Sequence, residues 1–564
     1  MAPIYYNYLP EDGFEFNKIT LVYIFTSLIA IFWLIKISKE KKIVLVKNIL
    51  LILALAFVIL NLASLAQSIH LYSSLWGNSY RFNGGFISLI NYVVLFFVFI
   101  ETFHDDKNAF YEIWGSILIS SAFVSAYGLY QIIKIHSLDA RIISTFGQPN
   151  YLGAYLALVI PANIFFILKE KDGIKKIGLI FLLLLNVFIL FATESRSAYL
   201  AVFAALMLMA ALNYKGFIKK KKKTILLILV LIFLAMLPFY KQMQYRVNKQ
   251  VFTEIKNQEV TTGSFSLRMF AWKGAWQVFL HNPILGTGPE TMMFSIPKYM
   301  DAKINNHIEW GYKFDKAHNE FLDILANTGI LSLTIFLLIL FFAFKKSFFN
   351  KEKDEKNQLL GIVLLSLILT NLFGFSCVVI ALYFWLILAL LVTQEKSVAK
   401  EVKLSTKVFF LFCFFIFLFF CFFVFCWSKI YLANIYFKKG DLENAVKYNP
   451  NIDRYHGELA LRYLQNNQNI EAISEAEKSI QSNALNADNY RVLAMVMANI
   501  DQNKTLSALD KAIELEPTNP KIYLEKAKYL IKINDIEKAK EMLQKTLDLK
   551  PNYEEAKTIL ESIK

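Results

Sequence analysis

The sequence predicts an all-α fold: a polytopic transmembrane helical bundle of about 12 spans, followed by a C-terminal TPR-like (tetratricopeptide-like) α-solenoid. Two observations lead to this prediction. The 564-residue chain is 56% hydrophobic, above the roughly 45–50% usual in soluble domains, and its long apolar runs end near residue 428. The remainder is polar helical sequence with a repeat. We therefore expect a transmembrane domain at 1–428, with a large loop at about 241–325, and a repeat domain at 429–564.

The apolar runs are each about long enough to cross a bilayer as a helix, which takes roughly 20 residues. The predicted spans are 18–35, 48–68, 86–103, 112–133, 151–168, 177–192, 198–214, 224–240, 326–344, 357–374, 376–393 and 406–427. The connection between the eighth and ninth spans is much longer than the others. Long connections of this kind usually carry function.

The loops between these spans differ in charge on the two sides of the membrane. Six alternate loops hold 25 Lys or Arg residues, whereas the short segments on the opposite side hold five. Positively charged loops stay in the cytoplasm. We therefore expect a multi-pass protein of the cytoplasmic (inner) membrane, with both termini, the large loop and the repeat domain outside. The net charge of +15 gathers at membrane flanks such as Lys219–Lys223, so we do not expect nucleic acid as a partner.

Arginines are prominent among the few charged residues expected at the outer face. They are Arg81, Arg141, Arg196 and Arg268, and each lies near the end of a span or in the large loop. A guanidinium binds phosphate well through its planar fork of donors. A shared phosphate site is therefore one interpretation, and an interfacial anchor is the alternative for each arginine taken alone.

His318 lies where a polar lead-in becomes a membrane span. We expect it in the first turn of a helix, at the outer boundary of the membrane. A neutral imidazole in that position can take a proton from a hydroxyl group. Asn319, Glu320 and Asp323 are the neighbours that would orient or support it, and spacing does not choose among them. The alternative is a solvated loop histidine.

We expect neither a metal nor another cofactor. The sequence has no HExxH motif and no P-loop, and its four cysteines lie in apolar runs without a partner at metal-ligand spacing. Gly286 and Gly288 lie in the large loop. We interpret them as turn residues, and the alternative is that they let backbone amides approach an anion.

The C-terminal region repeats with the TPR period, because Pro517 and Pro551 are 34 residues apart. Small residues fall where paired helices approach closely: Ala433, Ala445, Ala460, Ala472, Ala494, Ala508, Ala512, Ala527 and Ala539. We expect three to four degenerate repeats and a terminal capping helix. Such a stack forms a concave surface that binds peptides or proteins.

The ordered motifs "STFGQPNYLGAYLAL", "TESRSAYL", "SLR", "NPILGTGPE" and "HNEFLDILANTGILSL" resemble the O-antigen ligase / O-antigen polymerase superfamily. The chain is most similar to the subgroup with C-terminal TPR repeats, which includes bacterial O-oligosaccharyltransferases. The resemblance covers roughly residues 70–345. It implies a metal-independent glycosyltransferase whose donor is a glycan on undecaprenyl diphosphate. Family ligases are usually drawn with a cytoplasmic N-terminus, whereas the loop charges of this chain predict that its N-terminus lies outside.

The resemblance also implies roles for single residues. The family's histidine matches His318, the arginine of its Ser-Arg motif matches Arg196, and the arginine at the start of its large loop matches Arg268. Arg81 and Arg141 match less closely. We therefore predict that His318 is the catalytic base and that the arginines hold the donor diphosphate, in a single displacement that inverts the anomeric carbon.

The acceptor stays open between a protein hydroxyl, a lipid or cell-wall glycan, and the growing chain of a polysaccharide polymerase. The repeat domain favours a ligase with a protein or other large acceptor. A lipid-linked glycan transporter is a weaker alternative, because the membrane halves show no internal repeat. A non-enzymatic scaffold leaves the outer arginines unexplained. The expected partners are the lipid-linked donor, the acceptor and membrane lipids.

Overall fold

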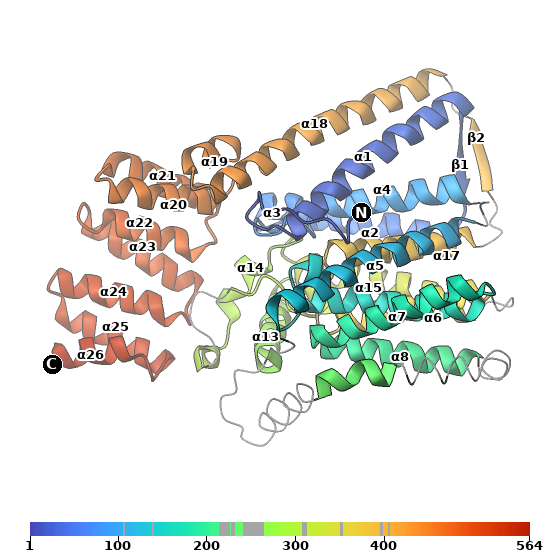
Figure 1. Ribbon diagram of the computed structural model, residues 1–564. Coiled ribbons are helices and arrows are strands. Elements are labelled where there is room, and N and C mark those ends of the chain that lie inside the picture. The colour runs from blue at the N-terminus through green and yellow to red at the C-terminus, as the bar shows by residue number, and fades with distance from the viewer. Residues whose placement is uncertain are drawn as a thin grey trace.

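The computed structural model describes residues 1–104, 106, 108–137, 140–213, 226, 230, 232–240, 264–306, 313–349, 354–394, 399–403 and 406–563. It confirms the all-α architecture, with a bundle of long helices and a stack of short helices at one end of the bundle (Figure 1). Among the described residues, eight helices are long and apolar enough to cross a membrane, and two shorter apolar helices accompany them. A multi-pass membrane protein follows.

The bundle is built from the helices that the apolar runs predict. Its elements are α1 (Glu15–Glu40), α2 (Ile49–Ala66), α3 (Leu71–Trp76), α4 (Phe86–Phe103), α5 (Ala109–Ile135), η1 (Ser144–Phe146), α6 (Pro149–Lys169), α7 (Gly173–Thr193), α8 (Arg196–Asn213), α15 (Glu320–Phe348), α16 (Glu355–Asn371), α17 (Val378–Thr393) and α18 (Thr406–Lys438). Each predicted span therefore coincides with a helix, except 224–240, of which residues 224–225, 227–229 and 231 lie outside the described residues.

The large loop contributes short elements at the end of the bundle that faces the repeats. They are α13 (Ser264–His281), α14 (Met292–Ser295), η4 (Pro297–Tyr299) and η5 (Ala302–Asn306), and η2 (Leu237–Phe239) precedes them. Figure 1 shows α13 and α14 between the long helices and the repeats. The large loop therefore lies between the bundle and the repeats.

A two-stranded ribbon lies at the opposite end of the bundle (Figure 1). Strands β1 (Lys42–Val46) and β2 (Ala399–Lys403) pair antiparallel, with Lys42 opposite Lys403. The two strands come from two loops that the sequence predicts to be on the same side of the membrane because both are basic. The structure places these two loops together.

Helix α15 is interrupted at Gly329, whose φ of 75° and ψ of −179° are not helical. The preceding loop fits into this break. The amide of Ile330 donates to the carbonyl of Pro283 at 2.9 Å, and the amide of Gly288 donates to the carbonyl of Asn327 at 2.8 Å. The loop thereby satisfies backbone groups that the interruption would leave unpaired.

The glycines of this loop act as turn residues. Gly286 and Gly288 have φ values of 68° and 109°, in the region that favours glycine. Their amides donate to the carbonyls of Asn282 and Asn327, at 3.1 and 2.8 Å. Because both amides are engaged with backbone carbonyls, the turn interpretation is confirmed over the anion-binding one.

The C-terminal stack consists of α19 (Leu442–Tyr448), α20 (Asp453–Gln465), α21 (Asn469–Ser482), α22 (Ala487–Met497), α23 (Gln502–Leu515), α24 (Pro520–Lys532), α25 (Ile536–Leu549) and α26 (Glu554–Ser562). The pairs α20–α21, α22–α23 and α24–α25 are the repeats, and α26 caps the stack. All nine alanines predicted at close helix contacts are buried. Helix α18 runs without interruption through residue 428, where the sequence suggests the domain boundary, and packs on α19.

Candidate functional site

His318 lies directly before α15, in a backbone turn with a φ of 52°. Asn319 is the N-cap of the helix, because its side-chain oxygen accepts hydrogen bonds from the amides of Phe321 and Leu322, at 3.0 and 3.1 Å. The expectation that His318 occupies the first helical turn is therefore wrong. The cap starts the helix at Glu320 and leaves His318 outside it.

Glu320 and Asp323 fix the backbone on either side of the imidazole. Asp323 Oδ1 accepts a hydrogen bond from the amide of Ala317 at 2.7 Å, so it holds the turn that precedes His318. Glu320 Oε2 accepts one from the amide of Ser376 at 2.7 Å, in the loop between α16 and α17. Both carboxylates thus bind backbone amides near His318.

The aromatic ring of Phe375 is shared by His318 and two cations. The His318 and Phe375 rings lie 5.2 Å apart between their centres, at an angle of 56°. The guanidinium of Arg81 lies 4.7 Å from the centre of the same ring, and Lys316 Nζ lies 5.9 Å from it. Cations interact favourably with the face of an aromatic ring at these distances. Phe375 therefore fixes the relative positions of the imidazole and the two cations.

Arg81 is held by three partners. Besides the ring of Phe375, it forms an ion pair with Asp315, and its Nη1 donates to the hydroxyl of Tyr151 at 2.9 Å. Arg81 comes from the connection between α3 and α4, Tyr151 from α6, and Asp315 from the large loop. One guanidinium thus joins its own segment to α6, to the loop between α16 and α17, and to the large loop at Asp315, which lies three residues before His318.

A second, buried ion pair joins Lys316 to Glu290. The two side chains are only 13% and 5% exposed. Burial alone would lower the pKa of Lys316, but the negative charges of Glu290 and Asp323 outweigh it and raise that pKa above its usual value. Gly84 makes room for Glu290, because a side chain at that position would overlap the carboxylate.

The electrostatic environment of His318 is positive. Burial lowers its pKa to about 4, and the charges of Arg268, Arg81 and Lys316 contribute in that order. The imidazole is therefore neutral near pH 7. The pKa of Arg268 is lowered in turn, by burial and then by the charge of Arg196. The charges of Arg81 and Arg268 thus both act on His318, and the charge of Arg196 acts on Arg268.

Arg141 has different neighbours. Its Nε donates to the carbonyl of Thr193 at 3.0 Å, and its Nη2 donates to Asn150 Oδ1 at 3.0 Å. Thr193 is the last residue of α7, three residues before Arg196. Arg141 therefore braces the turn that presents Arg196.

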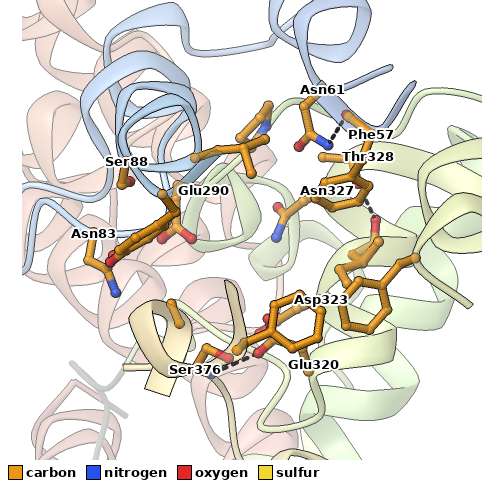
Figure 2. Close-up of a pocket in the computed structure, with 18 of the residues that line it drawn as sticks. Phe57, Asn61, Asn83, Ser88, Glu290, Glu320, Asp323, Asn327, Thr328 and Ser376 are labelled. Atoms are coloured by element: carbon orange, nitrogen blue, oxygen red, sulfur yellow. Dashed lines mark hydrogen bonds between the residues drawn. The ribbon is translucent and has the colours of Figure 1, made fainter. Parts of the chain in front are cut away.

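A cavity of about 160 Å³, lined by both apolar and polar side chains, lies beside the Lys316–Glu290 pair (Figure 2). Glu290, Glu320, Asp323 and Asn327 line it, and Figure 2 shows them around a common space. Within the described part of the chain, Asp323 Oδ2 and Asn327 Oδ1 are buried without a hydrogen-bond partner. The cavity lining holds three carboxyl groups and a single lysine, which is paired with Glu290, so it offers an anion less positive charge than the arginines do.

The residues that sequence reasoning missed are Phe375, Tyr151, Asp315, Lys316 and Glu290. Tyr151 and Glu290 fall inside the quoted motifs, but no spacing links them to His318. Among the described residues, no three His, Cys, Asp or Glu side chains are grouped so as to hold a metal ion.

Two family models match the chain. Residues 179–337 match the model described as O-Antigen ligase, and residues 501–563 match the model described as Tetratricopeptide repeat. The first match contains Arg196, Arg268 and His318. These matches confirm the resemblance that the motifs indicate.

No curated protein matches the chain. Solved structures with similarity include "Crystal structure of MamA", at 22% identity and a TM-score of 0.21, covering 23% of this chain and 82% of that one. Another is "Crystal structure of YrrB: a TPR protein with an unusual peptide-binding site", at 18% identity and a TM-score of 0.21, covering 24% of this chain and 73% of that one.

Proposed function

Because the chain fits an O-antigen ligase with C-terminal TPR repeats, we propose that it is a membrane glycosyltransferase. It transfers a glycan from undecaprenyl diphosphate to an acceptor hydroxyl at the outer face of the cytoplasmic membrane. One observation carries the proposal. The half-buried ring of His318 lies 5.2 Å from the ring of Phe375, over which Arg81 and Lys316 also lie, so a neutral proton acceptor and positively charged groups that can bind an anion occur together.

In this reaction His318 takes the proton of the acceptor hydroxyl, and the acceptor oxygen attacks the anomeric carbon of the donor. The bond between that carbon and the diphosphate oxygen breaks, and undecaprenyl diphosphate leaves with the electron pair. A single displacement inverts the anomeric configuration. The proton on His318 then passes to water.

The donor itself would increase the basicity of His318. In the free protein the pKa of His318 is about 4, which makes it a weak base. A bound diphosphate brings negative charge among the same cations, and negative charge nearby raises the pKa of an imidazole. The pKa of His318 is then closer to the pH at which the protein works, and general base catalysis is most efficient when the two are similar.

Arg196 and Arg268 are the proposed ligands of the diphosphate. Burial lowers the pKa of Arg268, and the positive charge of Arg196 lowers it further, so the two guanidinium groups are close enough to act on one anion. The same charges stabilise the leaving group as it departs. Arg81 adds positive charge from its fixed position, and Arg141 braces the turn before Arg196.

The repeat domain supports a ligase over a polysaccharide polymerase, because it contacts the segment that carries His318. Lys313 forms ion pairs with Asp488 and Glu516 of the repeats, at 2.7 and 3.1 Å. A domain that binds proteins next to the site is useful for a large acceptor.

The test is transfer by the purified protein in vesicles that contain the lipid-linked donor. A ligase moves the glycan from the lipid to an added acceptor, whereas a polymerase produces longer lipid-linked chains. A transporter moves the donor across the membrane unchanged, and a scaffold leaves it in place. An unchanged donor in the presence of protein, lipid and glycan acceptors would contradict the proposal.

A further inference from the structure

A cleft of about 540 Å³ separates the repeat domain from the end of the bundle. One wall consists of α20 and α22, and includes Gly457, Leu461 and Val492. The other wall comes from the large loop and the connection between α3 and α4, and includes Met293 and Asp315. The cleft therefore lies between the protein-binding repeats and the segment that carries His318.

The cleft reaches the proposed catalytic residue through a short series of contacts. Asp315, on its wall, pairs with Arg81. Arg81 lies over the ring of Phe375, and that ring contacts His318. The side chains of Arg81 and Phe375 therefore lie between the wall of the cleft and the imidazole.

The charge of the cleft suits an acceptor better than the donor. Carboxylates outnumber cations among its lining residues: Asp315, Asp453, Glu458 and Asp488 against Lys313 and Arg454. A diphosphate would be repelled there, and so would a phosphorylated glycan. A neutral or basic molecule would not be.

The apolar lining suits a polypeptide better than a sugar. A sugar would stack on open aromatic faces, but Arg454 lies 5.3 Å from the ring centre of Tyr80, and His70 packs on Phe294 at 4.8 Å. The remaining apolar lining is aliphatic: Leu461, Val492 and Met293, beside the bare backbone of Gly457. Aliphatic side chains of a bound peptide would pack against this surface.

Ion pairs fix the width of the cleft. Lys313 Nζ lies 2.7 Å from Asp488 and 3.1 Å from Glu516, and these carboxylates raise the pKa of Lys313 despite its burial. A further ion pair, 2.8 Å long, joins Arg454 to Glu11 in the N-terminal segment. Ion pairs therefore hold α20 and α22 against the other segments before any ligand binds.

We propose that this cleft binds an extended, neutral or basic polypeptide segment and delivers its acceptor hydroxyl to His318. The proposal rests on the proposed function for the transfer step. It adds the class of the acceptor, which is a polypeptide, and its binding site.

The first experiment blocks the cleft with Gly457→Trp. A Cβ atom added at Gly457 meets nothing closer than Val492 Cγ2, at 3.8 Å, and both residues line the cleft, so a larger side chain at this position would occupy it. Ser474→Trp, on the exposed side of α21, is the matched control. The probes are short synthetic peptides with a central serine or threonine, in acidic, neutral and basic versions. They are titrated against the full-length protein in detergent.

We expect the wild type and Ser474→Trp to bind neutral and basic peptides, and Gly457→Trp to bind them about tenfold or more weakly. Glu458→Lys would shift the preference toward acidic peptides, whereas Glu477→Lys on α21 would not. Equal binding by Gly457→Trp and Ser474→Trp would overturn the proposal. So would an unchanged charge preference in Glu458→Lys, which keeps the test valid if Gly457→Trp fails to fold.

Donor cleavage separates this proposal from the proposed function. Slow hydrolysis of the lipid-linked donor uses water as the acceptor and does not need the cleft, so Gly457→Trp should retain it. If peptides bind as expected but the wild type never cleaves the donor, the proposed function is wrong, and the proposal that the cleft binds a polypeptide still holds. If the wild type glycosylates a glycan and binds no peptide, the cleft proposal fails alone.

Discussion

The guanidinium of Arg81 lies 4.7 Å from the ring centre of Phe375, and the ring of His318 lies 5.2 Å from the same centre. Three segments distant in the chain thereby meet at one aromatic ring.

Replacing Phe375 tests the shared ring. Phe375→Leu removes the aromatic face and Phe375→Tyr keeps it, and a cation over such a face is worth about 0.5 to 2 kcal/mol. We expect Phe375→Leu to slow transfer by roughly 2- to 30-fold and Phe375→Tyr to stay near wild type. Initial rates at saturating donor measure the effect. Equal rates for the two variants would show that only the volume of the side chain matters.

His318→Ala should slow transfer by about 100- to 10,000-fold, as expected when a general base is removed. Donor binding should persist, because the arginines remain. His281→Ala is the matched control, since His281 is exposed at the end of α13 and binds the carbonyl of Gln277 at 2.8 Å. The measurement is glycan transfer by purified protein. Wild-type rates in His318→Ala would exclude the role of base.

The pH profile should show the lowered pKa of His318. In the free protein this imidazole is protonated only below about pH 4. We therefore expect that this group causes no fall in kcat/KM between pH 8 and about pH 5. The acid limb of kcat should lie at a higher pH than that of kcat/KM, because bound diphosphate raises the pKa of His318. An acid limb of kcat/KM near 6.5, the ordinary histidine value, would contradict the burial described above.

The same pKa has a consequence for stability. The pKa of His318 is lower in the folded protein than in the unfolded chain, so the unfolded chain binds the proton more readily between about pH 6.5 and 4. The stabilising contribution of the neutral imidazole is complete above that range and is lost as the pH falls through it. His318→Gln should reduce this loss in unfolding experiments.

Breaking the Lys316–Glu290 pair should be costly. Removing one partner leaves a buried charge uncompensated, which destabilises by about 3 to 5 kcal/mol. We expect this from Lys316→Met, and a partial recovery when Glu290→Gln is added. Lys273→Met breaks the exposed pair with Asp301, 2.7 Å long, and should cost at most about 1 kcal/mol. Equal unfolding midpoints for the two lysine variants would contradict the prediction.

Gly329→Ala should destabilise the protein or block its folding. The left-handed φ of 75° costs a side chain about 1 to 2 kcal/mol, and the new methyl would also overlap the carbonyl of Ile284. Gly178→Ala in α7 is the control, because nothing lies within 4 Å of the added carbon. Thermal unfolding in detergent compares the two. A stable Gly329→Ala would mean that the break in α15 can close.

The bundle and the repeats could be predicted because their signals are local. A run of apolar residues specifies a span by length and composition, and the 34-residue period places the small residues at helix contacts. The start of α15 was missed for a local reason too. The helical residue pattern begins before Asn319 in the sequence, but the Asn319 N-cap determines where the backbone hydrogen bonds of the helix begin.

The site could be predicted only in part. His318, Arg81 and Arg268 are conspicuous because charged or titratable groups are rare in the short segments predicted at the outer face and stand out in the large loop. Phe375 and Glu290 are not, since phenylalanine is common in this chain and a single glutamate carries no pattern. Their roles come from tertiary contacts between distant segments, which spacing along the chain does not encode.

Helix α18 passes from the bundle into the first turns of the repeat stack as one helix of 33 residues, without a hinge among its described backbone. In a helix, one inserted residue advances everything after it by about 1.5 Å and rotates it by about 100°. The orientation of the solenoid relative to the bundle is therefore set by the number of residues in α18. An insertion near residue 428 would turn the repeats away from the loops they contact, whereas a full heptad would return them almost to the same face, further out.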